Sequence, residues 1–118
     1  MGIPSGLWTS SGGSRLHIEI GPDNVVTGQY ATMHGRAGPD EFYPITGYVN
    51  EDMIGFVCSW GPHASVSTWC GRMIENESGK CLHVVWHLGR QFADTAHTIP
   101  NEITFTFHTN AGKFYYQA

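Results

Sequence analysis

The sequence predicts an all-β domain built from eight short antiparallel strands. Helix signals are nearly absent, and the 118 residues include 15 glycines and 6 prolines besides many threonines and aromatic residues. Turn signals also recur about every ten residues. Short, evenly spaced strands with tight connections are typical of an up-and-down barrel or a sandwich. The length suits one domain.

Turn-forming sequences rich in glycine, proline, asparagine and aspartate separate short runs of alternating polarity. The strands predicted between these turns, in chain order, are Gly6–Ser10, Ser14–Ile20, Val25–Thr32, Tyr43–Asn50, Met53–Trp60, Val66–Ile74, Cys81–Leu88 and Glu102–His108. Residues 1–5 and 110–118 are predicted to be terminal tails of this single domain, 1–118, with a turn at Asn110-Ala111-Gly112.

Composition excludes several classes of function. The chain is 41% hydrophobic and 13% aromatic, enough to bury a core, but only 14% charged. With a net charge of −4 and six scattered Lys and Arg residues, it has no basic patch for nucleic acid. No apolar stretch approaches the roughly 20 residues of a membrane helix. The N-terminus lacks a signal-peptide pattern, so either an intracellular protein or a start at a mature N-terminus fits.

Alternation along each strand sorts the side chains into an inward and an outward set. Leu16 and Ile18 are in phase with Ser14, and these residues are predicted to face inward. The other predicted inward positions include Gly28, Tyr30, Thr32, Ile54, Phe56, Cys58, Trp60, Ser67, Trp69, Leu82, Val84, Trp86, Leu88, Ile103, Phe105 and Phe107.

The predicted interior therefore holds three tryptophans, a tyrosine and several hydroxyls. A buried hydroxyl without a partner costs about 1–3 kcal/mol, so these groups need partners. Clustered aromatic rings with a few convergent polar groups are typical of a ligand pocket. The alternative is a closed barrel whose core satisfies its own hydroxyls, and the residues alone leave both open.

The sequence offers no clear metal or catalytic site. His83 and His87 are on one face of a predicted strand but ~13 Å apart, too far to share an ion. No histidine or carboxylate shares the face of Ser14, Tyr30 and Ser67, so no nucleophile–base pair can be assembled. We therefore expect no metal and no enzyme activity.

The three cysteines, Cys58, Cys70 and Cys81, fit no CxxC metal pattern. Free, half-buried thiols are the simplest interpretation. There are two alternatives. Two of the cysteines form a disulfide and the third stays free, or one of the thiols has a functional role.

Six segments form a more specific pattern: Gly6-Leu7-Trp8 with Gly13-Ser14, then 26–30, 43–47, 55–60, 65–71 and 82–88. In this order and spacing they resemble the avidin and streptavidin family of biotin-binding barrels, over about residues 6–108. The resemblance implies an eight-stranded antiparallel up-and-down β-barrel. It also implies that biotin is bound as a ligand, with no cofactor and no chemistry performed on it.

The resemblance implies three groups of contacts with biotin. Hydroxyls would bind the ureido group, indoles and a leucine would wall the ring and chain, and residues at the mouth would meet the carboxylate. The hydroxyls for the ureido group are those of Ser10, Ser14, Tyr30 and Thr32. The walls are Trp60, Trp69, Trp86 and Leu88, with Ser67 beside the sulfur. The residues at the mouth are Ser65, His34 and Gly35.

Two departures concern the ureido group. Ser10 stands where the family has an asparagine, and an ungapped comparison puts Ile103 where the eighth strand usually has aspartate or asparagine. Asn101, just before Ile103, is the polar candidate kept for that role. Fewer hydrogen bonds to the ureido group predict that biotin is bound less tightly than by the tightest-binding members of the family. Another small apolar or ureido-like ligand is the alternative guest.

A third departure concerns assembly. The family's tryptophan that reaches a neighbouring subunit would lie near Thr95, but no tryptophan follows Trp86. The resemblance therefore implies a homo-oligomer in which a dimer is favoured over a tetramer. The outward faces of the sixth and seventh strands, with Val66, Val85 and His87, are the expected interface. The family also implies a secreted or periplasmic protein.

Overall fold

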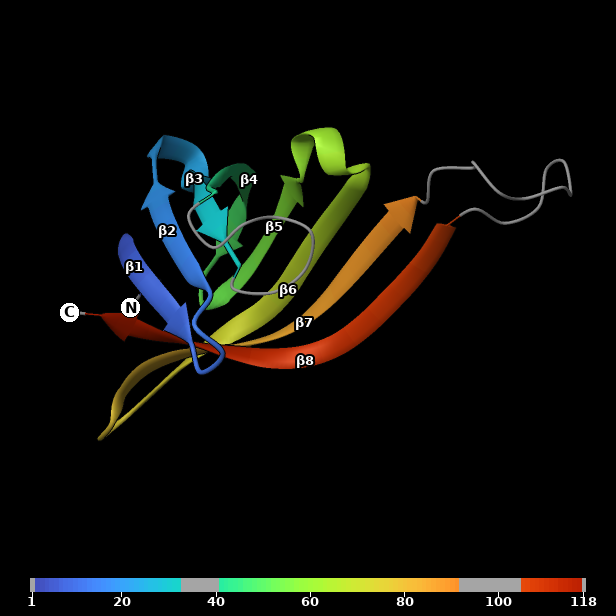
Figure 1. Ribbon diagram of the computed structural model, residues 1–118. Coiled ribbons are helices and arrows are strands. Elements are labelled where there is room, and N and C mark those ends of the chain that lie inside the picture. The colour runs from blue at the N-terminus through green and yellow to red at the C-terminus, as the bar shows by residue number, and fades with distance from the viewer. Residues whose placement is uncertain (1, 33–40, 92–104, 118) are drawn as a thin grey trace, which may run out of the picture.

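The computed structural model describes residues 2–32, 41–91 and 105–117, and it forms one closed antiparallel barrel (Figure 1). The strands follow the chain order around the barrel, and β8 closes it by pairing with β1. The elements are β1 (Gly6–Ser10), β2 (Arg15–Ile20), η1 (Pro22–Asn24), β3 (Val25–Ala31), β4 (Tyr43–Asn50), β5 (Met53–Ser59), η2 (Gly61–His63), β6 (Ser65–Asn76), β7 (Gly79–Gln91) and β8 (Phe105–Gln117). The all-β, eight-stranded up-and-down barrel predicted from sequence is confirmed.

The last three strands are longer than predicted, and β8 lies further along the chain than expected. Residues 110–117 are part of β8, so the predicted C-terminal tail and the predicted turn at 110–112 are wrong. Asn110, Ala111 and Gly112 pair in register with Trp86, Val85 and Val84 of β7. Strand pairing on this long neighbour overrides a turn-like local sequence.

This C-terminal segment is what closes the barrel. Phe114 pairs with Ser10, and Tyr116 pairs with Trp8, whose ring centroid lies 5.0 Å away. Trp8 is fully buried and Phe114 nearly so. Closure leaves no sheet edge unpaired between the first and last strands, which is how small barrels avoid edge-to-edge association.

The predicted inward series is confirmed for β2, β3, β5, β6 and the first half of β7. Fully buried side chains come from opposite sides of the barrel and form one core, among them Trp8, Leu16, Ile18, Val26, Cys58 and Leu82. Two inward glycines permit this close packing. A Cβ on Gly28, which has φ +150°, would lie 1.8 Å from the carbonyl oxygen of His17, and one on Gly71 would lie 2.1 Å from that of His83.

The predicted inward face of the eighth strand is wrong. Phe107 is 71% exposed and lies on the outer face, where a Cβ on Gly89 would lie 3.4 Å from its ring. In the register with β7, the even-numbered positions of β8 share the face of Trp86 and Leu88. Alternation alone assumes that the apolar set faces the core, whereas here the outer face is also apolar. Ile103 and the side chain of Phe105 lie outside what the structure describes.

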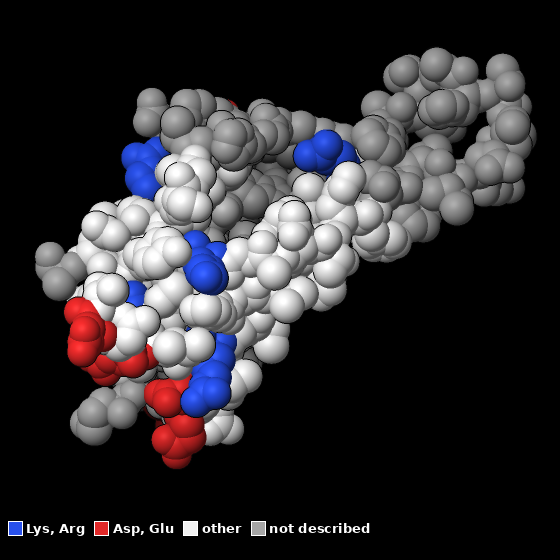
Figure 2. All heavy atoms as spheres, turned by 90° about the horizontal axis from the view of Figure 1, so that it is seen from below, with Lys and Arg blue, Asp and Glu red and all other residues white. Residues whose placement is uncertain are grey.

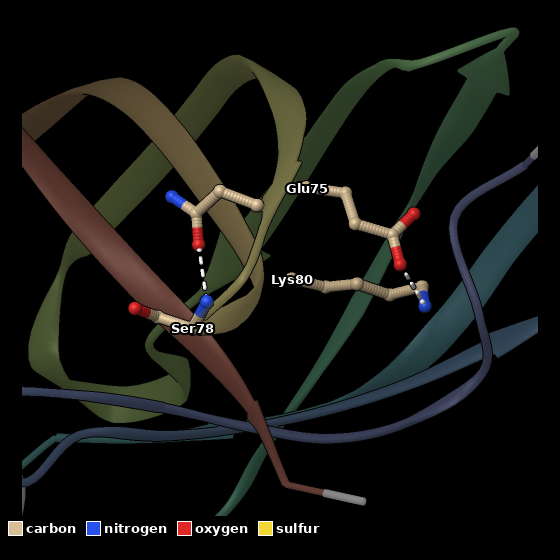
Figure 3. Close-up of polar contacts among 4 residues, drawn as sticks. Glu75, Ser78 and Lys80 are labelled. Carbon is tan, nitrogen blue, oxygen red and sulfur yellow. Dashed lines mark hydrogen bonds and ion pairs between the residues drawn. The ribbon is translucent and has the colours of Figure 1, made fainter.

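The β6–β7 hairpin turns at residues 77–78 (Figure 3). The Asn76 side-chain oxygen accepts a hydrogen bond from the Ser78 backbone N–H at 2.8 Å. Beside it, Lys80 Nζ and Glu75 Oε2 form an ion pair at 2.9 Å. The Asn76 side chain thus provides a partner for one backbone group of the turn. Glu75 and Lys80 are the charged residues, within the described chain, on the inward-facing positions at this end of β6 and β7, and they are paired with each other.

Candidate functional site

Four hydroxyl residues from β1–β3 and their ends converge near one end of the barrel interior. The Ser10 Oγ accepts a hydrogen bond from the Ser14 backbone N–H at 3.0 Å, which holds the two serines together across the β1–β2 turn. Ser14 and Tyr30 are buried. The Tyr30 hydroxyl interacts through hydrogen bonds with the side chains of Ser14 and Thr32. Three of these hydroxyls therefore form a connected polar group in an otherwise apolar interior.

The surroundings keep the phenol of Tyr30 neutral. Burial raises its pKa above the usual 10.0, and this effect exceeds the opposing effect of its hydrogen bonds to Ser14 and Thr32. A neutral phenol both donates and accepts, so it can join two neighbouring hydroxyls and still present a donor to a guest.

Aromatic rings surround this polar group. The ring of Tyr30 lies 4.7 Å from that of Trp69 and 5.6 Å from that of Trp60, and Trp69 stacks on Phe56 at 4.8 Å. The Trp60 Nε1 donates a buried hydrogen bond to the Ser67 Oγ at 2.9 Å. Both indoles are therefore held in place by contacts on several sides.

Trp86 completes the group of three tryptophans. It is the register partner of Trp69, so the two side chains lie on the same face of neighbouring strands. A Cβ on Gly112 of β8 would lie 3.5 Å from the Trp86 indole nitrogen, and both Trp86 and Leu88 are partly buried against the core. All three tryptophans thus face the interior, as predicted from alternation.

At the end of the barrel where β6 begins, Ser65 lies opposite Arg90 of β7. A hollow of about 550 Å³ borders this rim and is lined by residues from both faces of the sheet, among them Ser65, Val66, Gly89, Arg90 and Phe107. None of the three interior tryptophans lines it. The hollow is thus a feature of the rim and the outer surface, distinct from the aromatic interior.

The structure brings together ten of the predicted site residues on one face: Ser10, Ser14, Tyr30, Thr32, Trp60, Ser65, Ser67, Trp69, Trp86 and Leu88. His34, Gly35 and Asn101 lie outside the described residues.

Sequence reasoning missed three residues on this face. Asn110 is the register partner of Trp86, His108 is that of Leu88, and Arg90 is that of Ser65. The aromatic run Phe114-Tyr115-Tyr116 near the C-terminus, whose residue types favour strands, was the signal that could have revealed the full β8. Arg90 lay beyond the predicted end of its strand.

The three cysteines are free thiols, which decides against a disulfide. Cys58 faces the interior, and burial raises its pKa to about 12. Its thiol is therefore protonated at neutral pH and a poor nucleophile. Among the described residues, no group of three or more histidine, cysteine, aspartate or glutamate side chains is placed to hold a metal ion. Nor does that part of the chain contain a helix long and apolar enough to cross a bilayer.

Comparison with known proteins identifies the barrel. The model of the avidin family matches residues 2–111, nearly the whole chain. The chain belongs to the avidin family. Avidin-family proteins bind biotin as a ligand and perform no catalysis, so this avidin-family barrel is not an enzyme. Members of the avidin family are generally extracellular.

Solved structures agree with the avidin fold. The rhizavidin–biotin complex matches with a TM-score of 0.82 at 22% identity, over 98% of this chain and 93% of that one. The short afifavidin–biotin complex matches with a TM-score of 0.76 at 22% identity, over 92% and 85%. Xenavidin matches with a TM-score of 0.72 at 27% identity, over 94% of each chain. No curated protein matches the sequence.

Proposed function

We propose that this chain binds biotin with high affinity inside the barrel. The observation that carries the proposal is the hydrogen-bonded group of Ser14, Tyr30 and Thr32, set against the rings of Trp60 and Trp69. A ureido group is planar, with one acceptor oxygen and two N–H donors. Converging hydroxyls match the oxygen and one N–H, and indole faces match the apolar ring system.

Each group has a role in this proposal. When the guest binds, Ser14 and Tyr30 exchange the hydrogen bond between them for two that they donate to the ureido oxygen, with Ser10 beside them. Thr32, which donates to Tyr30, accepts one ureido N–H. Asn110, whose carboxamide oxygen can accept, takes the second N–H in place of Asn101. The tryptophans and Leu88 enclose the ring and chain, with Ser67 near the sulfur.

Rigidity supports high affinity. The hydroxyls and indoles are attached to paired strands and to one another, so little ordering entropy remains to be lost when a guest enters. Burying ~200 Å² of apolar ligand surface at about 25 cal/mol/Å² contributes about 5 kcal/mol. Water exclusion strengthens the hydrogen bonds to the ureido head. Because Ser10 has a shorter side chain than asparagine, we expect an affinity below the family's highest.

Calorimetric titration with biotin tests the proposal. We expect saturable binding with one biotin per chain. No heat at 100 µM protein, with no thermal stabilisation by biotin, would overturn it. Two further probes test the alternative, a guest that shares only part of the structure of biotin. Ethyleneurea keeps only the ureido head, and desthiobiotin keeps the head and the acyl chain but lacks the sulfur-containing ring.

We also propose that the chain forms a homodimer through the outer face of β5–β8. Successive register rows on this face contain Ser59, Val66, Gly89 and Phe107; Val57, Thr68, His87 and Thr109; and Gly55, Cys70, Val85 and Ala111. These rows carry no Asp, Glu, Lys or Arg, and Val66, Val85 and Phe107 are 46%, 46% and 71% exposed.

An apolar, uncharged strip of this kind is typical of an interface between subunits. Figure 2 shows the molecule from below: a few separate Lys and Arg side chains interrupt a mostly uncharged described surface, and acidic side chains gather at one end. Because the tryptophan associated with the tetramer is absent from the sequence, we propose that assembly stops at the dimer.

Sedimentation equilibrium tests this assembly. We expect a dimer for the native chain and a monomer for Val85→Lys, because the variant places a charge within the uncharged strip. Thr27→Lys, on the exposed outer face of β3, is the matched control and should remain dimeric. A native monomer or tetramer would overturn the dimer.

The cellular location follows from family membership alone. We propose that the protein is secreted or periplasmic, as a sequestering protein for free biotin would be. Fractionation of the producing cells tests this, with a cytoplasmic enzyme as marker.

A further inference from the structure

One charged side chain on the inner-face series has no role in the site described above. Arg90 continues the series Trp86 and Leu88 toward the end of the barrel, and it lies directly opposite Ser65. Within the described residues, the other Lys, Arg, Asp and Glu residues on the inner-face series are Lys80 and Glu75, and these are paired with each other at the far end of the strands (Figure 3). Arg90 is therefore the one lysine or arginine of this series at the mouth in the described chain, and the histidine His108 lies one register row away, opposite Leu88.

One donor of Arg90 has no acceptor in the described part of the chain. Arg90 is partly buried, and its Nε is buried without a hydrogen-bond acceptor among the described residues. A buried donor that finds no acceptor costs stability, and more so when the donor is charged. Such a cost is characteristic of a group whose partner arrives from outside the chain.

The chemistry of the position defines that partner. A guanidinium presents several N–H donors in a plane and binds carboxylates in paired hydrogen bonds. The Ser65 hydroxyl lies across the strand pair, where directly opposite Cβ atoms are about 4.5–5.5 Å apart. A cation with an adjacent hydroxyl donor, next to open space at the rim, is complementary to a carboxylate.

We propose that Arg90, together with Ser65, binds the carboxylate at the tail of the guest and makes this barrel selective for anionic ligands. The proposal rests on the proposed function, because the head of the guest must first be held by the hydroxyls and indoles. It adds a selectivity: free biotin is favoured over forms whose tail is an uncharged amide.

Titration of the native chain and of Arg90→Gln with biotin and with biotinamide, which keeps the ring but lacks the tail charge, tests this. We expect the native chain to bind biotin about tenfold or more tighter than biotinamide, the ratio expected for one charge-assisted pair. Arg90→Gln should bind both ligands alike, within about threefold, with biotinamide affinity unchanged. The far-ultraviolet circular dichroism and the thermal midpoint of the variant should match those of the native chain, which shows that it is folded.

Arg72→Gln is the matched control, since it removes the same charge from an exposed position on the outer face of β6. It should keep the native preference for biotin. If Arg90→Gln keeps that preference too, or if the native chain binds both ligands equally, the role of Arg90 is overturned while the proposed function stands. If the native chain binds neither ligand, the proposed function fails first.

Discussion

Asn110 lies directly opposite Trp86, its register partner across β7 and β8. The pairing places a carboxamide on the face that holds the interior tryptophans, at an exposed position, and under the proposed function it takes the role first considered for Asn101. The Asn110 side-chain oxygen accepts a hydrogen bond from the Ala111 backbone N–H at 2.8 Å. The side chain is thus oriented before any guest arrives.

We predict that Asn110→Ala weakens biotin binding by about tenfold to a hundredfold, because one ureido N–H loses its acceptor. Asn101→Ala is the control and should leave the affinity unchanged. Calorimetry on both variants measures this. The reverse result would return the role to Asn101.

The hydrogen bond from Trp60 to Ser67 makes a prediction about stability. Ser67→Ala leaves a buried indole N–H without its acceptor, so the free energy of unfolding should fall by about 1–3 kcal/mol. Ser59→Ala, at an exposed position of the neighbouring strand, should change it by less than about 0.5 kcal/mol. Urea denaturation followed by tryptophan fluorescence measures both. Equal effects would mean that the hydrogen bond adds nothing.

Trp69 is the most extensively stacked of the interior tryptophans, with Phe56 on one side and Tyr30 near it. Trp69→Ala should weaken biotin binding by more than about 2 kcal/mol, because it removes a rigid apolar wall. Trp69→Phe keeps part of the wall and should lose less, which leaves a test if the alanine variant does not fold. An unchanged affinity in the phenylalanine and alanine variants would remove Trp69 from the site.

The raised pKa of Tyr30 predicts a loss of stability at alkaline pH. As the pH passes 10.0, the unfolded phenol loses its proton while the buried one retains it, so the folded state binds more protons. The free energy of unfolding is therefore unaffected below that pH and declines above it. Tyr30→Phe should decline less steeply, as measured by denaturant titrations between pH 8 and pH 11. Parallel curves would contradict the assignment.

The raised pKa of Cys58 predicts an inert thiol. With a pKa of about 12 and no exposed surface, it should resist a thiol reagent at pH 8 in the folded protein. The Cys70→Ser/Cys81→Ser variant isolates Cys58. Labelling of this variant should be slow under native conditions and fast in guanidinium chloride, which serves as the internal control. Fast native labelling would show that the interior opens readily.

Most of the barrel was predictable because its strands carry strong local signals. Alternation of Ser14, Leu16 and Ile18, or of Ser67 and Trp69, correctly predicted which side chains face inward, since a pleated strand sends successive residues to opposite faces. The polar and aromatic character of the site followed from the same periodicity.

Alternation reveals two faces but not which one is the interior when both are apolar, and this explains the error at Phe107. It also cannot show which residues of separate strands lie opposite each other, because register depends on pairing across the whole sheet. The strand periodicity in the chain thus dictated a barrel with an aromatic, hydroxyl-lined interior. The pairing of β7 with β6 and β8, a long-range interaction, placed Arg90 beside Ser65 and Asn110 beside Trp86.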